Sequence, residues 1–341
     1  MRRLCLALAL VIAVPAPADE AEPSAGFRIW LDNYRAAAAT RGVAPAWLDA
    51  ALVDVRYSPR VVALDRAQPD AAASKTLFSD YLAAKFAGDR ISHGRARAAE
   101  LRTLIAEIAR RSGVAPEIIV AVWGIESSFG RVTGDYDLVP ALATLAFDGR
   151  RGALFTRELD AAVRIIGEGR LPRTALRGSW AGAFGQPQFL PSSYLAHGAD
   201  GDGDGKVDLV VSTPDTLASI ARYLADNGWQ AGVAWGFRTG VPAGFDRASV
   251  ANPVKPTSCV RPLERHSRWL PAADWRARGF TAFNAVWPGD SEPMSLVEPD
   301  GEGRGAFLTT ANYRVIMSYH CSNFYALSVA LLGDAVASAA R

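Results

Sequence analysis

The stretch Trp123-Gly124-Ile125-Glu126-Ser127-Ser128-Phe129-Gly130 decides how the middle of this chain folds. The apolar run before it begins at Pro116, a residue favoured in the first turn of a helix, and its aliphatic residues recur at helical spacing. We therefore expect a buried helix with Glu126 in its last turn. The helix dipole and the apolar neighbours both oppose a negative charge there, so the uncharged acid is favoured. Such a group suits general acid catalysis, and a surface glutamate in the last turn is the open alternative.

Length and composition describe a globular protein with an export signal at its start. The chain has 341 residues, of which 50% are hydrophobic and 21% charged, enough for one large core or two modest ones. Arg2 and Arg3 precede an apolar run from Leu4 to Val14, and Ala16-Pro17-Ala18 supplies small residues for cleavage. We expect residues 1–18 to be a secretory signal peptide, with an uncleaved anchor as the alternative. We expect no transmembrane segment in the mature chain, because no later run is long and apolar enough.

The balance of charge argues against partners that are bound by bulk electrostatics. Loss of the two arginines with the signal would bring the 37 basic residues level with the 35 acidic ones. A neutral chain lacks the basic surface that nucleic acids and anionic membranes attract. We therefore expect no nucleic-acid partner.

Two cysteines, Cys259 and Cys321, follow the predicted signal. An even pair in an exported chain suggests a disulfide, and two buried free thiols are the alternative. We expect the disulfide, because export delivers the chain to an oxidising compartment.

Apolar spacing predicts a mainly α (α+β) chain, with a disordered linker over residues 19–26 and one domain over 27–341. The segments with helical periodicity are 27–53, 77–86, 94–112, 116–126, 141–166, 216–224 and 324–340. Residues 56–72, with two prolines and little periodicity, are expected to be extended, and residues 306–319 to form one or two short strands. Proline, glycine and tryptophan interrupt residues 236–310, which we expect to be an irregular β portion.

Three further segments extend the pattern around Glu126. They are Asp137-Leu138-Val139-Pro140-Ala141-Leu142-Ala143-Thr144-Leu145-Ala146-Phe147-Asp148-Gly149-Arg150-Arg151, Gly178-Ser179-Trp180-Ala181-Gly182-Ala183-Phe184-Gly185-Gln186-Pro187-Gln188-Phe189-Leu190-Pro191-Ser192-Ser193-Tyr194, and Asn312-Tyr313-Arg314-Val315-Ile316-Met317-Ser318-Tyr319 with Ser322 and Tyr325-Ala326. In this order they closely resemble the membrane-bound lytic murein transglycosylase B family. The resemblance implies a goose-type-lysozyme-like fold: a helical catalytic core over about 95–235, an insertion over 236–310, and a return to the core over 311–341.

The resemblance also implies an activity on the glycan strands of peptidoglycan, in the periplasm. Enzymes of this family cut the β-1,4 bond between N-acetylmuramic acid and N-acetylglucosamine without water, and they leave a 1,6-anhydro ring. One carboxylate, Glu126, would serve as acid and then base, and no cofactor is needed for the chemistry. The alternatives are a hydrolytic muramidase with Asp135, Asp137 or Asp148 as a second acid, and a non-catalytic peptidoglycan-binding scaffold. Association with complexes for cell-wall synthesis or hydrolysis is a further expectation.

The same resemblance assigns sugar-binding roles to several residues. Ser179, Gln188 and Tyr319 match cleft residues of the family, although Ser179 could equally be a turn former. His320 stands where the family has an asparagine, and Pro187 stands where it has a glycine, so contacts at both positions are expected to differ. Tyr136 is a candidate aromatic platform for a sugar ring, or a core residue.

The segment from Asp200 to Asp208 follows the opening of an EF-hand loop. Asp200, Asp202 and Asp204 occupy alternate positions, which lets their oxygens converge on one hard cation. The twelfth position is Val211, where a glutamate is usual. The resemblance implies a longer loop that ends on Asp215, with Lys206 contributing its backbone carbonyl. We expect a structural Ca²⁺, with a metal-free Asp-Gly turn as the alternative.

Overall fold

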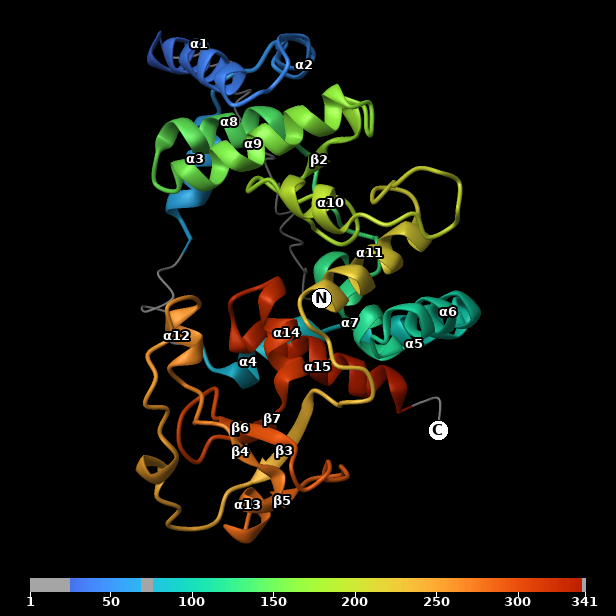
Figure 1. Ribbon diagram of the computed structural model, residues 1–341, viewed down its shortest axis with the longest axis vertical. Coiled ribbons are helices and arrows are strands. Elements are labelled where there is room, and N and C mark those ends of the chain that lie inside the picture. The colour runs from blue at the N-terminus through green and yellow to red at the C-terminus, as the bar shows by residue number, and fades with distance from the viewer. Residues whose placement is uncertain (1–24, 69–75, 339–341) are drawn as a thin grey trace, which may run out of the picture.

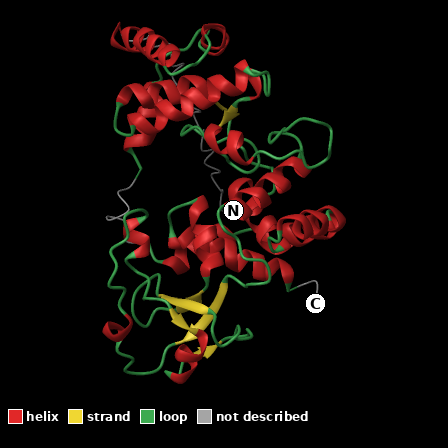
Figure 2. Cartoon of the chain, viewed as in Figure 1, coloured by secondary structure: helices red, strands yellow, loops and turns green. Residues whose placement is uncertain are grey.

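The computed structural model describes residues 25–68 and 76–338. The predicted signal peptide and almost all of the predicted linker therefore lie outside the described residues. The described chain is mainly helical with a small strand portion, which confirms the predicted class (Figure 2).

The elements follow one another in this order. The α-helices are α1 (Ala25–Thr40), α2 (Pro45–Ala51), α3 (Pro59–Arg66), α4 (Phe78–Phe86), α5 (Arg90–Glu100), α6 (Arg102–Ser112), α7 (Pro116–Ser127), α8 (Leu138–Asp148), α9 (Gly152–Gly167), α10 (Pro191–His197), α11 (Thr213–Asp226), α12 (Val260–Leu263), α13 (Ala272–Ala277), α14 (Ala311–Tyr319) and α15 (Asn323–Ala337). The strands are β1 (Tyr136–Asp137), β2 (Arg177–Gly178), β3 (Gly236–Gly240), β4 (Leu270–Pro271), β5 (Thr281–Ala282), β6 (Pro293–Val297) and β7 (Ala306–Thr309), and two 3₁₀ turns cover Arg173–Ala175 and Arg247–Val250.

Three hydrophobic clusters follow one another along the long axis of the molecule (Figure 1). The first, which we call the central bundle, joins α4, α6, α7, α11, α14 and α15. The second, the upper layer, joins α1–α3 with α8–α10. The third lies on the small sheet. Residues from the range 95–235 contribute to both the central bundle and the upper layer.

Helix α7 forms the middle of the central bundle. Its residues Ile118–Ile125 and Ser127 are all buried, as expected for a helix that is hydrophobic on every side. The helix ends where Ser128 and Phe129 adopt left-handed backbone angles of 52° and 61° in φ. The ring of Phe129 then folds back over Gly124, where an added Cβ would approach it to 2.6 Å. Glu126 is held in the last turn by this sharp ending.

The upper layer contains a helix that we did not expect. Residues 56–72 were predicted to be extended, but α3 covers Pro59–Arg66. Its proline stands in the first turn, where no backbone N–H is required, and the Ser58 hydroxyl caps the helix by accepting from the Val61 N–H. The proline was therefore a start signal and not a break.

The sheet occupies the predicted β portion, with strand order β4-β6-β7-β3-β5 and antiparallel pairing throughout. Strand β7 ends at Thr309, and residues 311–319 form α14, so the predicted strands over 306–319 are only partly correct. Apolar residues in so short a run are compatible with the period of a helix and with that of a strand. Residues 311–319 form a helix here because α14 is buried in the central bundle.

The turn between α14 and α15 is tied to the sheet portion. Cys321 in this turn forms a disulfide with Cys259, and their Cα atoms are 5.4 Å apart. The two helices bend by 112° across the turn. Within the described residues, no single helix has the length and apolar character to cross a membrane, and only this bent pair passes by length and composition when both helices are counted together.

Candidate active site and metal loop

A pocket of about 270 Å³ opens beside the end of α7. Its lining comes from α4, α7, the α14–α15 turn and α15, namely Tyr81, Lys85, Ile125, Glu126, His320, Ser322 and Tyr325. Glu126 is the only carboxyl group among these lining residues. The structure therefore places Glu126, the acid proposed from the sequence, in the lining of this pocket.

Glu126 is almost enclosed, with 8% of its side chain exposed. Its Oε1 accepts a 2.5 Å hydrogen bond from the Tyr325 hydroxyl and lies 3.4 Å from His320 Nε2. No hydrogen bond or ion pair is found for Oε2 within the part of the chain that the structure describes. One oxygen is thus positioned by the protein, and the other is left for a ligand in the pocket.

Two tyrosines stay protonated around this carboxylate. Burial raises the pKa of Tyr325 well above its usual value, and the charge of Glu126 raises it further. Burial and Glu126 have the same effect on the pKa of Tyr319. A phenol with a raised pKa remains a hydrogen-bond donor at every working pH, so Tyr325 is a permanent donor to Glu126.

The α14–α15 turn delivers the C-terminal side of the pocket. The Ser322 hydroxyl accepts from the backbone N–H of Tyr325 and caps α15, while the preceding Cys321 is held by its disulfide. This short turn places His320, Ser322 and Tyr325 on one wall. Their proximity follows from the bend between two helices and not from a single helical face.

Tyr319 links this wall to the segment over 178–189. Its hydroxyl donates to the carbonyl of Pro187 over 2.7 Å, and its ring contacts those of Tyr223 and Phe189 at centroid distances of 4.7 and 5.8 Å. Pro187 cannot donate a backbone hydrogen bond, and its carbonyl is used here instead. Tyr319 therefore lies at the junction between the pocket and this segment.

The structure brings Tyr136, Ser179 and Gln188 near one another. Tyr136 on β1 pairs with Gly178 on β2, next to Ser179, and the Gln188 side chain donates to the carbonyls of Thr133 and Gly185 over 2.9 Å. The Arg60 guanidinium lies over the Tyr136 ring at 5.6 Å.

These three residues are not joined directly to Glu126. The Ser179 hydroxyl accepts from the Ala183 N–H over 3.0 Å, which is a turn-stabilising contact. Among the described residues, no hydrogen bond or ion pair connects Ser179 or Gln188 to Glu126. The predicted site residues therefore form two groups, with Tyr319 between them.

The candidates for a second acid lie elsewhere. Asp137 caps α8 through the Val139 N–H and pairs with Arg173, while Asp148 pairs with Arg66 at 2.6 Å. Neither they nor Asp135 lines the pocket. The geometry therefore favours a single-carboxylate reaction over two-acid hydrolysis.

The sequence interpretation assigned no role to Tyr325, Tyr81 or Lys85. Tyr325 belongs to one of the motifs named above, but its distance from Glu126 along the sequence does not indicate that the two side chains are in contact. Helical periodicity located α4 approximately, yet periodicity identifies a buried face and not the helix against which it packs. The sequence lacked the information on which helices pack against one another in the tertiary structure.

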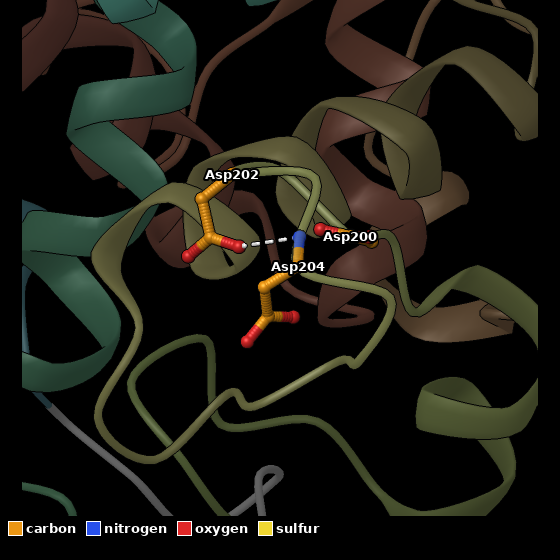
Figure 3. Close-up of side chains that lie close together, drawn as sticks. All are labelled: Asp200, Asp202 and Asp204. Carbon is orange, nitrogen blue, oxygen red and sulfur yellow. Dashed lines mark hydrogen bonds between the residues drawn. The ribbon is translucent and has the colours of Figure 1, made fainter.

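The aspartate loop before α11 presents a second chemical feature. Carboxylate oxygens of Asp200, Asp202 and Asp204 all lie within 4.8 Å of one another (Figure 3). Asp200 accepts from the N–H groups of Gly203 and Gly205, and the latter hydrogen bond is the main cause of its lowered pKa. Converging hard oxygens of this kind fit Ca²⁺.

Asp215 has a different position in this loop. It is 1% exposed, and its two oxygens accept from the N–H groups of Gly201 and Asp208 over 2.8 and 2.7 Å. Burial raises its pKa, and the two N–H groups oppose that rise. Asp215 therefore braces both sides of the loop and does not belong to the three-carboxylate cluster. Lys206 donates its N–H to Asp204 and is exposed.

Comparison with known proteins identifies relatives over nearly all of the described chain. The family model for the transglycosylase SLT domain matches residues 26–334. Membrane-bound lytic murein transglycosylase B of Escherichia coli (strain K12) is 34% identical over 234 residues, which cover 67% of this chain and 58% of that protein. The chain therefore matches less than two thirds of the length of this relative.

Solved structures agree with the fold. SltB3 from Pseudomonas aeruginosa in complex with NAG-anhNAM-pentapeptide is 36% identical with a TM-score of 0.81, and the match covers 91% of this chain and 79% of that one. The Escherichia coli lytic transglycosylase SLT35 in complex with calcium is 26% identical with a TM-score of 0.71, with coverage of 92% and 93%.

Proposed function

The chain belongs to the transglycosylase SLT domain family, and from this premise we propose that it is a lytic murein transglycosylase acting on the glycan strands of peptidoglycan. The proposed reaction cleaves the β-1,4 bond between N-acetylmuramic acid and N-acetylglucosamine and forms a 1,6-anhydro ring. The observation that carries the proposal is the pocket beside the end of α7, which has Glu126 as the only carboxyl group in its lining.

Glu126 performs both proton transfers in this proposal. The protonated carboxyl group gives its proton to the glycosidic oxygen as the bond to C1 breaks. The resulting carboxylate takes the proton of the C6 hydroxyl, whose oxygen attacks C1 and closes the ring. The N-acetyl group of the muramic acid stabilises C1 in between, as in substrate-assisted enzymes.

The surroundings of Glu126 favour these steps. Tyr325 donates to Oε1, so a preorganised donor stabilises the negative charge that appears on the carboxylate after the first transfer. Only 8% of the Glu126 side chain is exposed, so little water reaches its carboxylate, and the C6 hydroxyl of the bound muramic acid would be its proton donor in the second step.

Sugar binding extends from the pocket over the 178–189 segment. We assign Tyr319, His320, Ser179, Gln188 and Tyr136 to this surface. Tyr319 supports it, because its hydrogen bond to Pro187 and its tilted ring contact with Tyr223 join the two groups of residues. Aromatic faces and amide groups of this kind suit sugar rings and their hydroxyls.

Digestion of purified sacculi tests the proposal. The protein and its Glu126→Gln variant are incubated with sacculi, and the muropeptides are separated by chromatography and identified by mass spectrometry. We expect anhydro-muropeptides from the unsubstituted protein alone. Glu117→Gln, at the other end of α7, is the matched control and should retain activity. Products with only reducing-end muramic acid would indicate a hydrolase, and bound but uncut sacculi would indicate a binding protein.

We also assign a structural Ca²⁺ to the loop, with Asp200, Asp202, Asp204 and the carbonyl of Lys206 as ligands and Asp215 as the brace beneath them. The convergence of three carboxylates supports this assignment. The ion would neutralise their mutual repulsion and hold the loop, and it has no part in the chemistry. Calorimetry and thermal unfolding with millimolar CaCl₂ test it, and absence of both heat and stabilisation would remove it.

Export to the periplasm completes the proposal. It rests on the sequence of residues 1–18, which lie outside the described residues, and on the location of peptidoglycan. Cell fractionation, together with N-terminal sequencing of the mature protein, tests it. Association with cell-wall synthesis or hydrolysis complexes stays a prediction.

A further inference from the structure

Helix α4 lines two pockets. Tyr81 and Lys85, one turn apart, face the pocket of Glu126, and Phe78 and Leu82, also one turn apart, face a second pocket. Because residues three and four apart are neighbours on a helix surface, the two pairs form adjoining stripes on α4. Helix α15 also lines both pockets. The second pocket is therefore a neighbour of the first along the same two helices.

The second pocket has a volume of about 150 Å³ and combines apolar and cationic side chains. Phe307 on β7 is buried in its lining and contacts the Phe78 ring at a centroid distance of 6.2 Å. Arg238 on β3 stands opposite Phe307 in the strand register, so both side chains project from the same face of the sheet. Arg304, in the loop between β6 and β7, is the second arginine of the lining, and both arginines are exposed. One ligand could thus meet apolar surface and two guanidinium groups together.

The two guanidinium groups have no protein partner. Within the described residues, neither Arg238 nor Arg304 forms an ion pair or donates a side-chain hydrogen bond. The acid of the lining, Asp300, is engaged elsewhere: its Oδ1 accepts from the Phe78 N–H over 2.6 Å. This hydrogen bond ties the loop that carries Arg304 to the start of α4. Two cations against one anion leave the lining positive, and the planar fork of arginine matches a carboxylate.

We propose that this second pocket binds the carboxylate end of the peptide stem carried by the muramic acid whose glycosidic bond is cut at Glu126. The inference rests on the proposed function, and it names the part of the substrate that the second pocket recognises. Arg238 and Arg304 bind the carboxylate, while Phe78, Leu82 and the other apolar side chains of the lining contact the short aliphatic side chains of the stem.

The length of a stem is sufficient for this arrangement. A rise of 1.5 Å per residue places Phe78 about 10 Å from Lys85 along α4. A fully extended peptide of about five residues spans about 17 Å. A stem that leaves the sugar beside Lys85 is therefore long enough to end in the second pocket.

Paired substrates test the inference. Soluble glycan oligomers that carry peptide stems are compared with the same oligomers after an amidase has removed the stems. The ratio of kcat/KM on the two substrates is measured for the unsubstituted protein, for Arg238→Gln/Arg304→Gln and for Arg278→Gln. Arg278 follows α13, is exposed and lines neither pocket, so it controls for the loss of positive charge.

We expect the double substitution to lower this ratio about 10- to 100-fold through a higher KM for stem-bearing oligomers, because hydrogen bonds to a charged group contribute this much to binding. Arg278→Gln should leave the ratio unchanged. An unchanged ratio in the double variant, or an equal fall in the control, would overturn the inference.

Binding measurements separate the inference from the proposed function. Glu126→Gln is titrated with both oligomers by calorimetry, alone and in combination with the two arginine substitutions. Stem-bearing oligomers should bind more tightly than stem-free ones, and the arginine substitutions should remove the difference. Equal affinities for the two oligomers in Glu126→Gln would overturn the stem site even where the unsubstituted protein forms anhydro products. A difference that depends on the arginines would uphold the stem site even in a protein that forms no such products, and the proposed reaction alone would then fail.

Discussion

Tyr325 donates a hydrogen bond to Glu126 from a position 199 residues further along the chain. Close packing of α15 against α7 brings the Tyr325 hydroxyl within reach of the Glu126 carboxylate. Gly124 and Gly333 both lie at this interface, where an added Cβ would come within 3.1 Å of Leu332 and Ile118 respectively. The small residues let the helices approach, and the approach lets the phenol reach the carboxylate.

Replacement of Tyr325 by phenylalanine should lower kcat/KM by about 10- to 100-fold. A hydrogen bond to a charged group contributes about 1.5–3 kcal/mol, and 1.4 kcal/mol corresponds to a factor of ten in rate. Release of anhydro-muropeptides measures the change.

Tyr34→Phe is the matched control for this substitution. Tyr34 donates a comparable 2.7 Å hydrogen bond to Asp160 in the upper layer, away from the pocket. It should lower stability without lowering kcat/KM. Equal activity losses in both variants would show that the effect of Tyr325→Phe comes from folding and not from Glu126.

Two aspartates of the metal loop should respond differently to substitution. Asp202→Asn removes one of the three converging charges and should abolish the rise in Tm produced by Ca²⁺. Its effect on the Tm measured in EDTA should be small. Asp215→Ala leaves two partly buried N–H groups without their acceptor, so it should lower stability by about 1–3 kcal/mol even in EDTA. Thermal unfolding with and without Ca²⁺ separates the two; identical responses would contradict the distinction between ligand and brace.

Reduction of the Cys259–Cys321 disulfide should destabilise the protein. The cysteines are 62 residues apart, and the chain-entropy model gives about 4 kcal/mol for closing a loop of this length. Urea unfolding of the oxidised protein and of the Cys259→Ser/Cys321→Ser variant measures the difference. Because Cys321 adjoins His320, the variant should also lose activity below its unfolding range, and full activity there would show that the bond does not position this turn.

Gly130→Ala should damage the segment that follows Glu126. The residue has φ of 82°, and an added Cβ would approach Gln186 Oε1 to 2.6 Å, where that oxygen accepts from the Trp123 indole. Gly232→Ala is the control, since its φ is 77° and nothing lies within 4 Å of an added Cβ. The difference in unfolding free energy between the variants isolates the contact, and we expect Gly130→Ala to be the less stable by more than about 1 kcal/mol.

Local pattern was sufficient for much of the fold. The buried run from Pro116 predicted α7 and the place of Glu126 in its last turn, because helical period and a proline start are properties of neighbouring residues. The alternate aspartates predicted the convergence of Asp200, Asp202 and Asp204 for the same reason. The pattern failed at α3 and α14, where a proline and a short apolar run were each compatible with two conformations.

The sequence by itself determined which segments are helical, where the acid stands on its helix and which loop gathers carboxylates, since these depend on contacts within a few residues. Only the tertiary structure decided that Tyr325 and His320 contact Glu126, that Lys85 lines the same pocket, and that Ser179 and Gln188 stand apart from Glu126. Periodicity marks a face to be buried, but the partner of that face is chosen by packing between helices and by the bend at Cys321. The chemistry of the pocket is therefore a property of the packed bundle.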